Sequence, residues 1–316
     1  MTSRHLVDPE LLPLLDLWPT MALTVDLLPL ARNRDVPRPE LPADDIVQEV
    51  VQAPGPAGAP DVALHVFRPG GAEEPLGCIY HIHGGGYVMG GAADMAFMLR
   101  PMAQQLGCVI VSVDYRLAPE TPFPGPIEDC YAGLAWTFAQ AERLGIDPAR
   151  IGVMGESAGG GLAAALALLA RDRGAYPLAF QHLIYPMIDD RTCVRDGDPL
   201  TGEFIWTRES NRFGWASLLG AAPGGEDVPP YAAAARAQDL AGLPPTYIAS
   251  GALDLFLHED LDYARRLLAA GVPTELHIWP GAFHGFEMMT TARIAQEATA
   301  ARLAALRRAL APRADG

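Results

Sequence analysis

A serine between two glycines is the pattern in this chain best suited to chemistry. The run GESAG at residues 155–159 follows an apolar stretch, residues 151–154, and leads into a long Ala- and Leu-rich segment. A serine on a sharp strand-to-helix turn is held in a strained conformation that exposes its hydroxyl, and the flanking glycines avoid a clash with neighbouring backbone. The pattern therefore predicts that Ser157 is a nucleophile.

A second glycine-rich motif, HGGG at residues 83–86, lies upstream of this serine, directly after a strand-like run. Attack on a carbonyl produces a negative oxygen, and glycine lets the backbone turn its amides toward such a charge. We expect an oxyanion hole at Gly84, Gly85, Gly86 and Ala158, with the amides of the last three as donors. By chance, a chain of this composition is expected to contain roughly 0.06 matches to the serine pattern and about 0.01 matches to HGGG. The two motifs in this order are therefore a strong signal.

A serine needs a base to take its proton, and in strand–turn–helix nucleophile folds the order is Ser, then Asp or Glu, then His. Four of the eight histidines precede Ser157 and two lie in strand-like runs, which leaves His258 and His284. His284 follows the last predicted strand among small residues that let a loop curl inward. We expect His284 to be the base and His258 to lie in the first turn of a helix.

The third member must orient this histidine, and Asp254 is the predicted acid. It comes just after the strand-like run 246–251 and so projects from the carboxyl end of the penultimate strand. Its rivals are Asp189 and Asp190, which follow the preceding strand. The alternative role for Asp254 is capping of the helix that starts near Glu259.

The elements that must position these residues alternate along the chain. Strands are predicted at residues 47–51, 62–67, 77–83, 108–113, 151–154, 180–185, 246–250 and 275–279, and helices at 127–142, 158–172, 259–270 and 292–309. Residues 53–60 have the composition of a hairpin connection. This alternation predicts an α/β protein with a mostly parallel eight-stranded sheet and helices on both faces.

Two segments fall outside this alternation, and we predict that together they form a helical cap over the carboxyl ends of the strands. The predicted division is a cap segment at 1–45, a core at 46–188, a cap insertion at 189–230 and the rest of the core at 231–316. Asp8 is a candidate N-cap with Pro9 at the first helical position, and the apolar side chains that follow include Leu11, Leu12, Leu14, Leu15 and Trp18. The alternative places both segments at the periphery, far from the site.

Composition excludes several classes of function. The chain has 316 residues, 50% of them hydrophobic, and no apolar run of the ~18 residues that a membrane span requires. A net charge of −15 argues against nucleic acid or an anionic membrane as a partner. Acidic residues interrupt the first apolar run, so we expect no secretory signal and a cytoplasmic location. The four cysteines lack CxxC spacing and are expected to be buried and reduced.

With these motifs in place, the chain resembles the hormone-sensitive-lipase-like branch of α/β-hydrolases, the bacterial family IV esterases. The resemblance runs from about residue 8 to the C-terminal helix and is carried by HGGGYVMG at 83–90, DYRLAPE at 114–120, GESAGG at 155–160, GLPPTYI at 242–248 and HGF at 284–286. It implies an α/β-hydrolase fold with a two-part cap, carboxylesterase activity on short- to medium-chain acyl esters, an oxyanion hole at HGGG and no cofactor. Two departures are Glu156 in place of the usual Asp or Thr, and Leu257 and His258 in the usual DPLRDE run.

Three functions compete. The first is a serine esterase acting through Ser157, Asp254 and His284 on a small ester. The second is an amidase or arylformamidase with the same residues, which a comparison of ester and amide turnover separates. The third is a non-catalytic binding module, which would be expected to lack one of these three residues. The C-terminal helix carries Ile294, Leu303, Leu306 and Leu310 on one face, which packs on the sheet or forms a homodimer contact.

Overall fold

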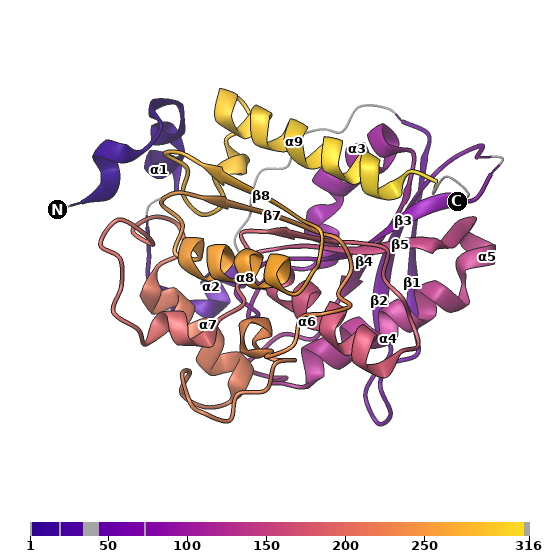
Figure 1. Ribbon diagram of the computed structural model, residues 1–316, viewed down its shortest axis with the longest axis horizontal. Coiled ribbons are helices and arrows are strands. Elements are labelled where there is room, and N and C mark those ends of the chain that lie inside the picture. Colours follow the sequence, from indigo (N-terminus) through magenta and orange to yellow (C-terminus); the bar gives the residue numbers. More distant parts are fainter. Residues whose placement is uncertain (1, 19, 34–43, 73, 313–316) are drawn as a thin grey trace.

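A single eight-stranded sheet forms the centre of the molecule (Figure 1). The computed structural model describes residues 2–18, 20–33, 44–72 and 74–312. The strands are β1 (Ile46–Ala53), β2 (Val62–Pro69), β3 (Leu76–Ile82), β4 (Val109–Asp114), β5 (Ile146–Glu156), β6 (Gln181–Ile184), β7 (Thr246–Gly251) and β8 (Thr274–Trp279). Their order is β1-β2-β4-β3-β5-β6-β7-β8, with β1–β2 and β2–β4 antiparallel and the other neighbours parallel. The predicted mostly parallel eight-stranded sheet is confirmed.

Helices cover both faces of this sheet. They are α1 (Leu12–Leu17), α2 (Leu28–Arg32), α3 (Ala96–Leu106), α4 (Gly125–Ala139), α5 (Ala141–Leu144), α6 (Ala158–Arg173), α7 (Arg208–Leu219), α8 (Leu257–Ala269) and α9 (Arg293–Leu310). Helices α3 and α9 lie above the sheet in Figure 1, and α4, α6 and α8 lie below it. The sheet is therefore buried on both sides, as its nearly continuous apolar strands require.

The alternation of side chains along the strands assigns each residue to one face. In β3, Cys78, Tyr80 and Ile82 belong to the core that α4 and α6 complete, whereas Ile79 packs with Leu306 of α9. Leu306 and Leu310 are buried, so the apolar face predicted for the last helix packs within the molecule, against the sheet. Successive residues of a strand point to opposite faces, which is why one strand serves both layers.

Two helices differ from the sequence prediction. Helix α3 lies inside the region 47–113, which was expected to contain only strands, and was missed because Pro101 interrupts its pattern. The helix predicted at 127–142 is two helices, because α4 ends at Ala139 and α5 begins at Ala141. The other predicted elements lie within a few residues of their observed bounds, and 53–60 falls in the turn that joins β1 to β2.

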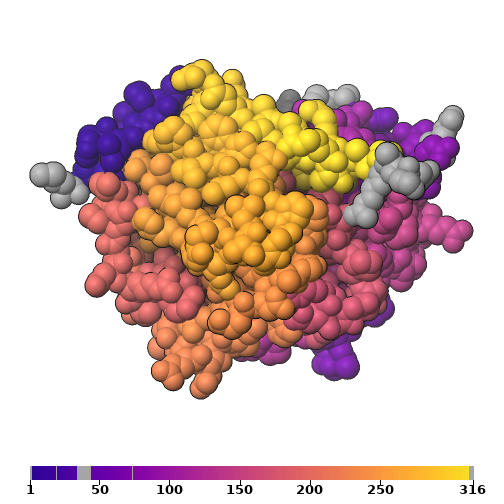
Figure 2. All heavy atoms as spheres, viewed as in Figure 1, coloured from indigo at the N-terminus to yellow at the C-terminus, as the bar shows by residue number. Residues whose placement is uncertain are grey.

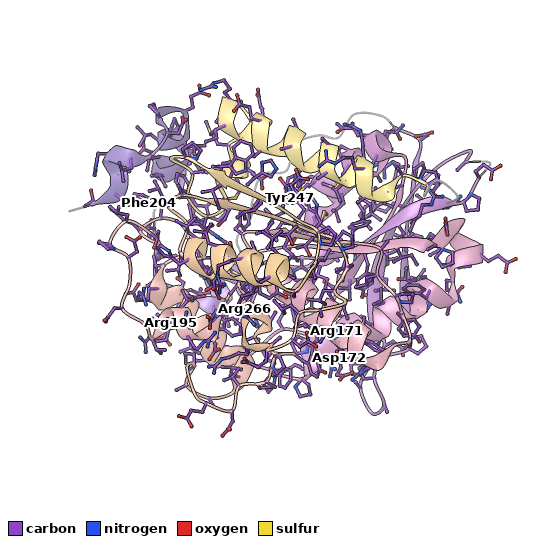
Figure 3. The ribbon with its side chains drawn as sticks, viewed as in Figure 1. Arg171, Asp172, Arg195, Phe204, Tyr247 and Arg266 are labelled. Carbon is purple, nitrogen blue, oxygen red and sulfur yellow. The ribbon has the colours of Figure 1, made fainter. Side chains whose placement is uncertain are left out.

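The N-terminal segment and the insertion pack on one another at the carboxyl ends of the strands. Asp8 accepts a hydrogen bond from the amide of Glu10 at 2.9 Å, the predicted cap. The amide of Leu23 donates to Ser210 Oγ of α7 at 2.9 Å. Phe204 of the insertion lies beside the N-terminal segment, whose indigo atoms border the insertion in Figure 2 (Figures 2 and 3). Residues 34–43 of the predicted cap segment lie outside the described residues, and the division into cap and core stays a prediction.

The structure also bears on two expectations from composition, that the cysteines are buried and reduced and that no segment spans a membrane. Cys78, Cys108, Cys130 and Cys193 are all buried and free of disulfide bonds. Burial raises the pKa of the Cys108 thiol to about 12, so it stays protonated at neutral pH. Among the described residues, no helix has the length and apolarity needed to cross a bilayer.

Candidate active site

The turn between β5 and α6 places Ser157 in a conformation that few residues adopt. Its backbone has φ 55° and ψ −122°, and its amide donates to Ile184 O at 2.9 Å. A Cβ on Gly155 would lie 2.2 Å from Gly159 O, and one on Gly159 would lie 2.0 Å from Ile82 O. Both glycines are therefore needed where β5, α6 and the end of β3 meet, as the GxSxG pattern predicts.

Three residues distant in the sequence meet at this turn. Ser157 Oγ lies 2.9 Å from Nε2 of His284, and Nδ1 of His284 lies 2.8 Å from Oδ2 of Asp254. Asp254 follows the carboxyl end of β7, and its Oδ1 accepts from the amide of Phe256 at 2.9 Å. Because a carboxylate only accepts, His284 donates through Nδ1, which leaves Nε2 free to accept the serine proton.

Aromatic rings enclose the imidazole of His284, which is 7% exposed. Tyr185 and Phe256 contact it edge-on, with ring centroids at 4.7 and 5.2 Å, and Trp206 lies at 6.5 Å. The sequence does not reveal these three residues, because the loops that carry them have no periodic pattern that would indicate where their side chains lie. The rings shield the hydrogen bonds of His284 from bulk water.

Backbone strain concentrates around the same site. Four described residues other than glycine have positive φ: Tyr87 at 68°, Ser157 at 55°, Tyr185 at 35° and Ile205 at 59°. Tyr87 follows Gly86, Tyr185 contacts His284, and Ile205 precedes Trp206. Such conformations cost of order 1–3 kcal/mol each and persist where surrounding structure holds them, as at active sites.

The HGGG loop lies against the serine turn. A Cβ on Gly84 would lie 2.9 Å from Glu156 O and 3.4 Å from Ser157 Cβ. Gly85 and Gly86 have φ values of 117° and 60°, which only glycine adopts freely. Within the described part of the chain, neither of these amides donates to a backbone acceptor outside regular structure, and Ala158 occupies the first helical position of α6. All three amides can therefore donate to a ligand beside Ser157.

The other candidates for the acid and the base, Asp189, Asp190 and His258, have partners away from Ser157. Asp189 pairs with Arg191 at 2.7 Å, and Asp190 pairs with Arg236 at 2.8 Å. His258 lies in the first turn of α8, as predicted, and its exposed ring lies 2.9 Å from Asp198. The structure thus brings Asp254, and neither of its rivals, to His284.

A second carboxyl group lies buried near Asp254. Asp260 of α8 is 0% exposed, and a side-chain hydrogen bond from Ser250 acts on its carboxyl group. Burial raises the pKa of Asp260 well above its usual range, and the charges of Glu259 and Asp254 raise it further. The carboxyl group of Asp260 therefore keeps its proton to a higher pH in the folded protein than in the unfolded chain, and its ionisation would place a second negative charge near Asp254.

Replacement of Asp260 by asparagine is expected to stabilise the protein at alkaline pH. Between the ordinary pKa and the raised one, the unfolded chain loses a proton that the folded chain keeps, so the free energy of unfolding falls as pH rises, by about 1.4 kcal/mol per pH unit of that interval. Asparagine has the same shape and cannot ionise. Urea denaturation at pH 4 and pH 8 should show an advantage of Asp260→Asn that grows with pH, whereas the exposed control Asp262→Asn should show none. An advantage independent of pH would mean that Asp260 is ionised in the folded state.

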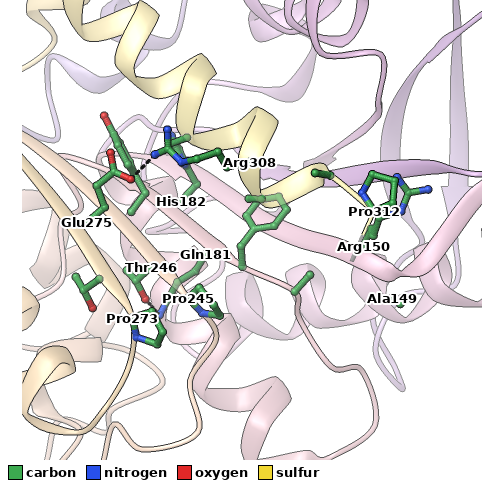
Figure 4. A pocket seen from close by; sticks show the side chains of 17 residues that line it. Ala149, Arg150, Gln181, His182, Pro245, Thr246, Pro273, Glu275, Arg308 and Pro312 are labelled. Atoms are coloured by element: carbon green, nitrogen blue, oxygen red, sulfur yellow. Dashed lines mark hydrogen bonds and ion pairs between the residues drawn. The ribbon is translucent and has the colours of Figure 1, made fainter. Parts of the chain in front are cut away.

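A groove elsewhere on the molecule has none of the predicted site residues (Figure 4). It measures about 560 Å³ and lies at the amino ends of β6, β7 and β8, beside the last turns of α9. Arg150, Gln181, Thr246 and Arg308 are among the residues that line it. In α/β sheets of this type, ligands bind at the carboxyl ends of the strands, which is the end that holds Ser157. In the part of the chain that the structure describes, no group of three or more His, Cys, Asp or Glu residues could hold a metal ion.

Comparison with known proteins agrees with this fold. The family model of the alpha/beta hydrolase fold matches residues 79–288. The carboxylesterase NlhH of Mycobacterium tuberculosis is 35% identical over 324 aligned residues, which cover 98% of each chain. A solved bacterial heroin esterase is 40% identical, with a TM-score of 0.91 over 98% of this chain and 100% of its own. Esterase LipW of Mycobacterium marinum is 36% identical, with a TM-score of 0.75 over 84% of this chain and 83% of its own.

The sheet order, the strained serine turn and these matches define an α/β-hydrolase. The chain belongs to the hormone-sensitive-lipase-like family of carboxylesterases within that fold. The resemblance drawn from the sequence motifs is thereby confirmed, and with it the class of enzyme, a carboxylic ester hydrolase.

Proposed function

We propose that this enzyme hydrolyses short- to medium-chain acyl esters through an acyl-enzyme on Ser157, with His284 as base and Asp254 as its orienting acid. One observation carries the proposal: the two hydrogen bonds of 2.9 and 2.8 Å that join Ser157 to His284 and His284 to Asp254. They form at a nucleophile turn and beside free backbone amides, which is the arrangement that acyl transfer needs.

The proposed reaction has two halves. Ser157 Oγ attacks the ester carbonyl while Nε2 of His284 takes the serine proton, and Asp254 stabilises the imidazolium that forms. The amides of Gly85, Gly86 and Ala158 donate to the oxyanion. The tetrahedral intermediate then collapses, and His284 gives its proton to the departing alkoxide, which leaves as an alcohol. In the second half, His284 takes a proton from water and the resulting hydroxide attacks the acyl carbonyl. The second tetrahedral intermediate collapses with cleavage of the acyl–Oγ bond, His284 returns its proton to Oγ of Ser157, and the carboxylic acid leaves.

Trp206 of the insertion supports the preference for short acyl chains. Its side chain lies so close to the oxyanion loop that a Cβ on Gly86 would lie 2.2 Å from its Cη2 atom. The indole donates through Nε1 to Asn211 Oδ1 at 3.2 Å, and α7 packs against the ring, since a Cβ on Gly214 would lie 3.5 Å from its Cζ2 atom. The ring is thus fixed beside the reacting centre, where it limits the length of the acyl chain. In this role the insertion acts as part of a cap.

Turnover of p-nitrophenyl esters from acetyl to dodecanoyl, compared with the matching p-nitroanilides, tests the proposal. We expect kcat/KM to be highest between two and about eight acyl carbons and turnover of the anilides to be lower by orders of magnitude. Comparable or faster anilide turnover would favour an amidase. Folded protein without turnover of either series would indicate a binding module.

Replacement of Trp206 by alanine is expected to move the preference toward longer acyl chains. Space for two further methylene groups is worth about 1.6 kcal/mol, so the ratio of kcat/KM for the octanoyl ester to that for the butanoyl ester should rise about tenfold. The control is Trp136→Ala, which removes a tryptophan of α4 that stacks with Arg143 away from the site. An unchanged ratio in Trp206→Ala would show that this ring does not bound the acyl chain.

A further inference from the structure

Glu156, the residue before Ser157, takes part in a network of charged groups on the face of the sheet that α9 covers. We propose that Arg302 of α9 is a positioning residue, which holds the serine turn and the His284 loop in register through two carboxylates, the buried Glu156 and the largely buried Glu287. The inference rests on the proposed roles of Ser157 and His284, and it concerns how the protein keeps them together.

Strand alternation places the first half of this network. Ile79, Ile110 and Met154 all pack with Leu306 of α9. The residues two positions further along each strand are His81, Ser112 and Glu156, so they face the same side of the sheet. His81 Nε2 donates to Glu156 Oε2 at 2.9 Å, and Nδ1 of the same ring lies 2.8 Å from Ser112 Oγ. Three adjacent strands are thus joined directly behind Ser157.

Arg302 reaches this region from α9. It is 5% exposed, and its Nη1 lies 3.7 Å from Oε2 of Glu287. Glu287 belongs to a short helix, η6 (Phe286–Met288), that begins two residues after His284. The backbone of α9 also packs on this short helix and on β5. The guanidinium of Arg302 is therefore paired with the short helix that follows His284, and it is carried by a helix that also packs on β5, the strand that ends just before Ser157.

Charge ties both carboxylates to Arg302. Burial alone would raise the pKa of Glu156, but His81 and Arg302 together lower it below its ordinary value. Burial raises the pKa of Glu287, Arg302 opposes that rise, and the charge of Glu156 adds to it. Burial would lower the pKa of Arg302, yet the two carboxylates hold it above its ordinary value. The two acids repel one another, and Arg302 is the cation that offsets this repulsion.

This arrangement acts on the reacting atoms through neighbouring residues of the chain. Glu156 is joined to Ser157 by one peptide bond, and Glu287 lies three residues after His284. Without Arg302, the two carboxylates would move apart or take up a proton. Either change shifts the serine turn relative to the histidine loop and lengthens the 2.9 Å contact between Oγ and Nε2. A displacement of about 1 Å at such a contact can cost about 10²-fold in rate.

The test compares three variants with the wild-type enzyme on a short-chain p-nitrophenyl ester, at a temperature where circular dichroism shows all of them folded. Arg302→Met should lower kcat by about tenfold or more while KM stays within about twofold, because the substrate contacts are untouched. Arg302→Lys, which keeps the charge, should retain at least about a third of the wild-type kcat. The matched control is Arg307→Met, which removes an exposed arginine from the same helix and should leave kcat unchanged.

The inference is wrong if Arg302→Met lowers only the melting temperature and keeps the wild-type kcat per folded molecule. If Arg302→Met does not fold, the test uses Glu287→Gln, which keeps the shape of the Glu287 side chain and removes its charge. A drop in its kcat of about threefold or more supports the positioning role, and an unchanged kcat contradicts it. Wild-type enzyme without esterase activity would instead contradict the proposed function.

Discussion

Replacement of Ser157 by alanine is expected to lower kcat for a butanoyl p-nitrophenyl ester by about 10⁵-fold or more. Its Oγ lies 2.9 Å from Nε2 of His284, the proposed base, on a turn that β5, α6 and the HGGG loop fix together, so we expect no other group to replace it. Steady-state assays at saturating ester, corrected for the uncatalysed rate, compare the kcat of the variant with that of the wild-type enzyme.

The matched control for this variant is Ser217→Ala. Ser217 is as buried as Ser157, at 8% exposed, but it lies on α7 of the insertion. It should retain nearly all of the wild-type kcat. A Ser157→Ala enzyme with more than about one hundredth of the wild-type activity would mean that the acyl group is carried elsewhere or that water attacks directly.

Replacement of Asp254 by asparagine is expected to lower kcat by about 10³- to 10⁴-fold with little change in structure. Asp254 is fully buried and accepts from His284 Nδ1 at 2.8 Å, which fixes the ring with Nε2 toward the serine. An asparagine amide can donate to Nδ1, and that donation favours the tautomer whose Nε2 already carries a proton. The base would then be unable to accept from Ser157.

The rival acid supplies the comparison for this second variant. Asp189→Asn removes a carboxylate that pairs with Arg191 and Arg195 at the start of the insertion. We expect it to lower the melting temperature and to leave kcat per folded molecule within about threefold of wild type. If Asp189→Asn lost more kcat than Asp254→Asn, the assignment of Asp254 as the acid would be wrong.

The sequence allowed prediction of the parts in which residue type and spacing carry a physical requirement. Gly155 and Gly159 are required by the close approach of backbone, and the positions of Asp254 and His284 follow from their place after the last two strands. The α/β architecture could be predicted because its buried strands are short and apolar. Family motifs added the class of reaction, which the comparisons confirm, and the expected oxyanion role of the HGGG loop, which stays a prediction.

Other features depend on contacts that no local pattern reveals. Helix α3 escaped prediction because Pro101 breaks its apparent pattern, although neighbouring strands stabilise it. Trp206 lies in an irregular insertion, so its approach to Gly86 depends on how that insertion packs. In the sequence, Arg302 is one of several charged residues on a predicted surface helix. Its burial results from the packing of α9 across the sheet, which the local sequence does not indicate.

The most direct test of the central claim is mass spectrometry of the protein after reaction with a p-nitrophenyl alkylphosphonate, which mimics the tetrahedral intermediate and is not released. The account predicts one adduct per chain, on the peptide that contains Ser157, formed in parallel with the loss of esterase activity and absent from His284→Ala. Complete loss of activity with the adduct on another residue, or full activity after Ser157 is modified, would contradict it.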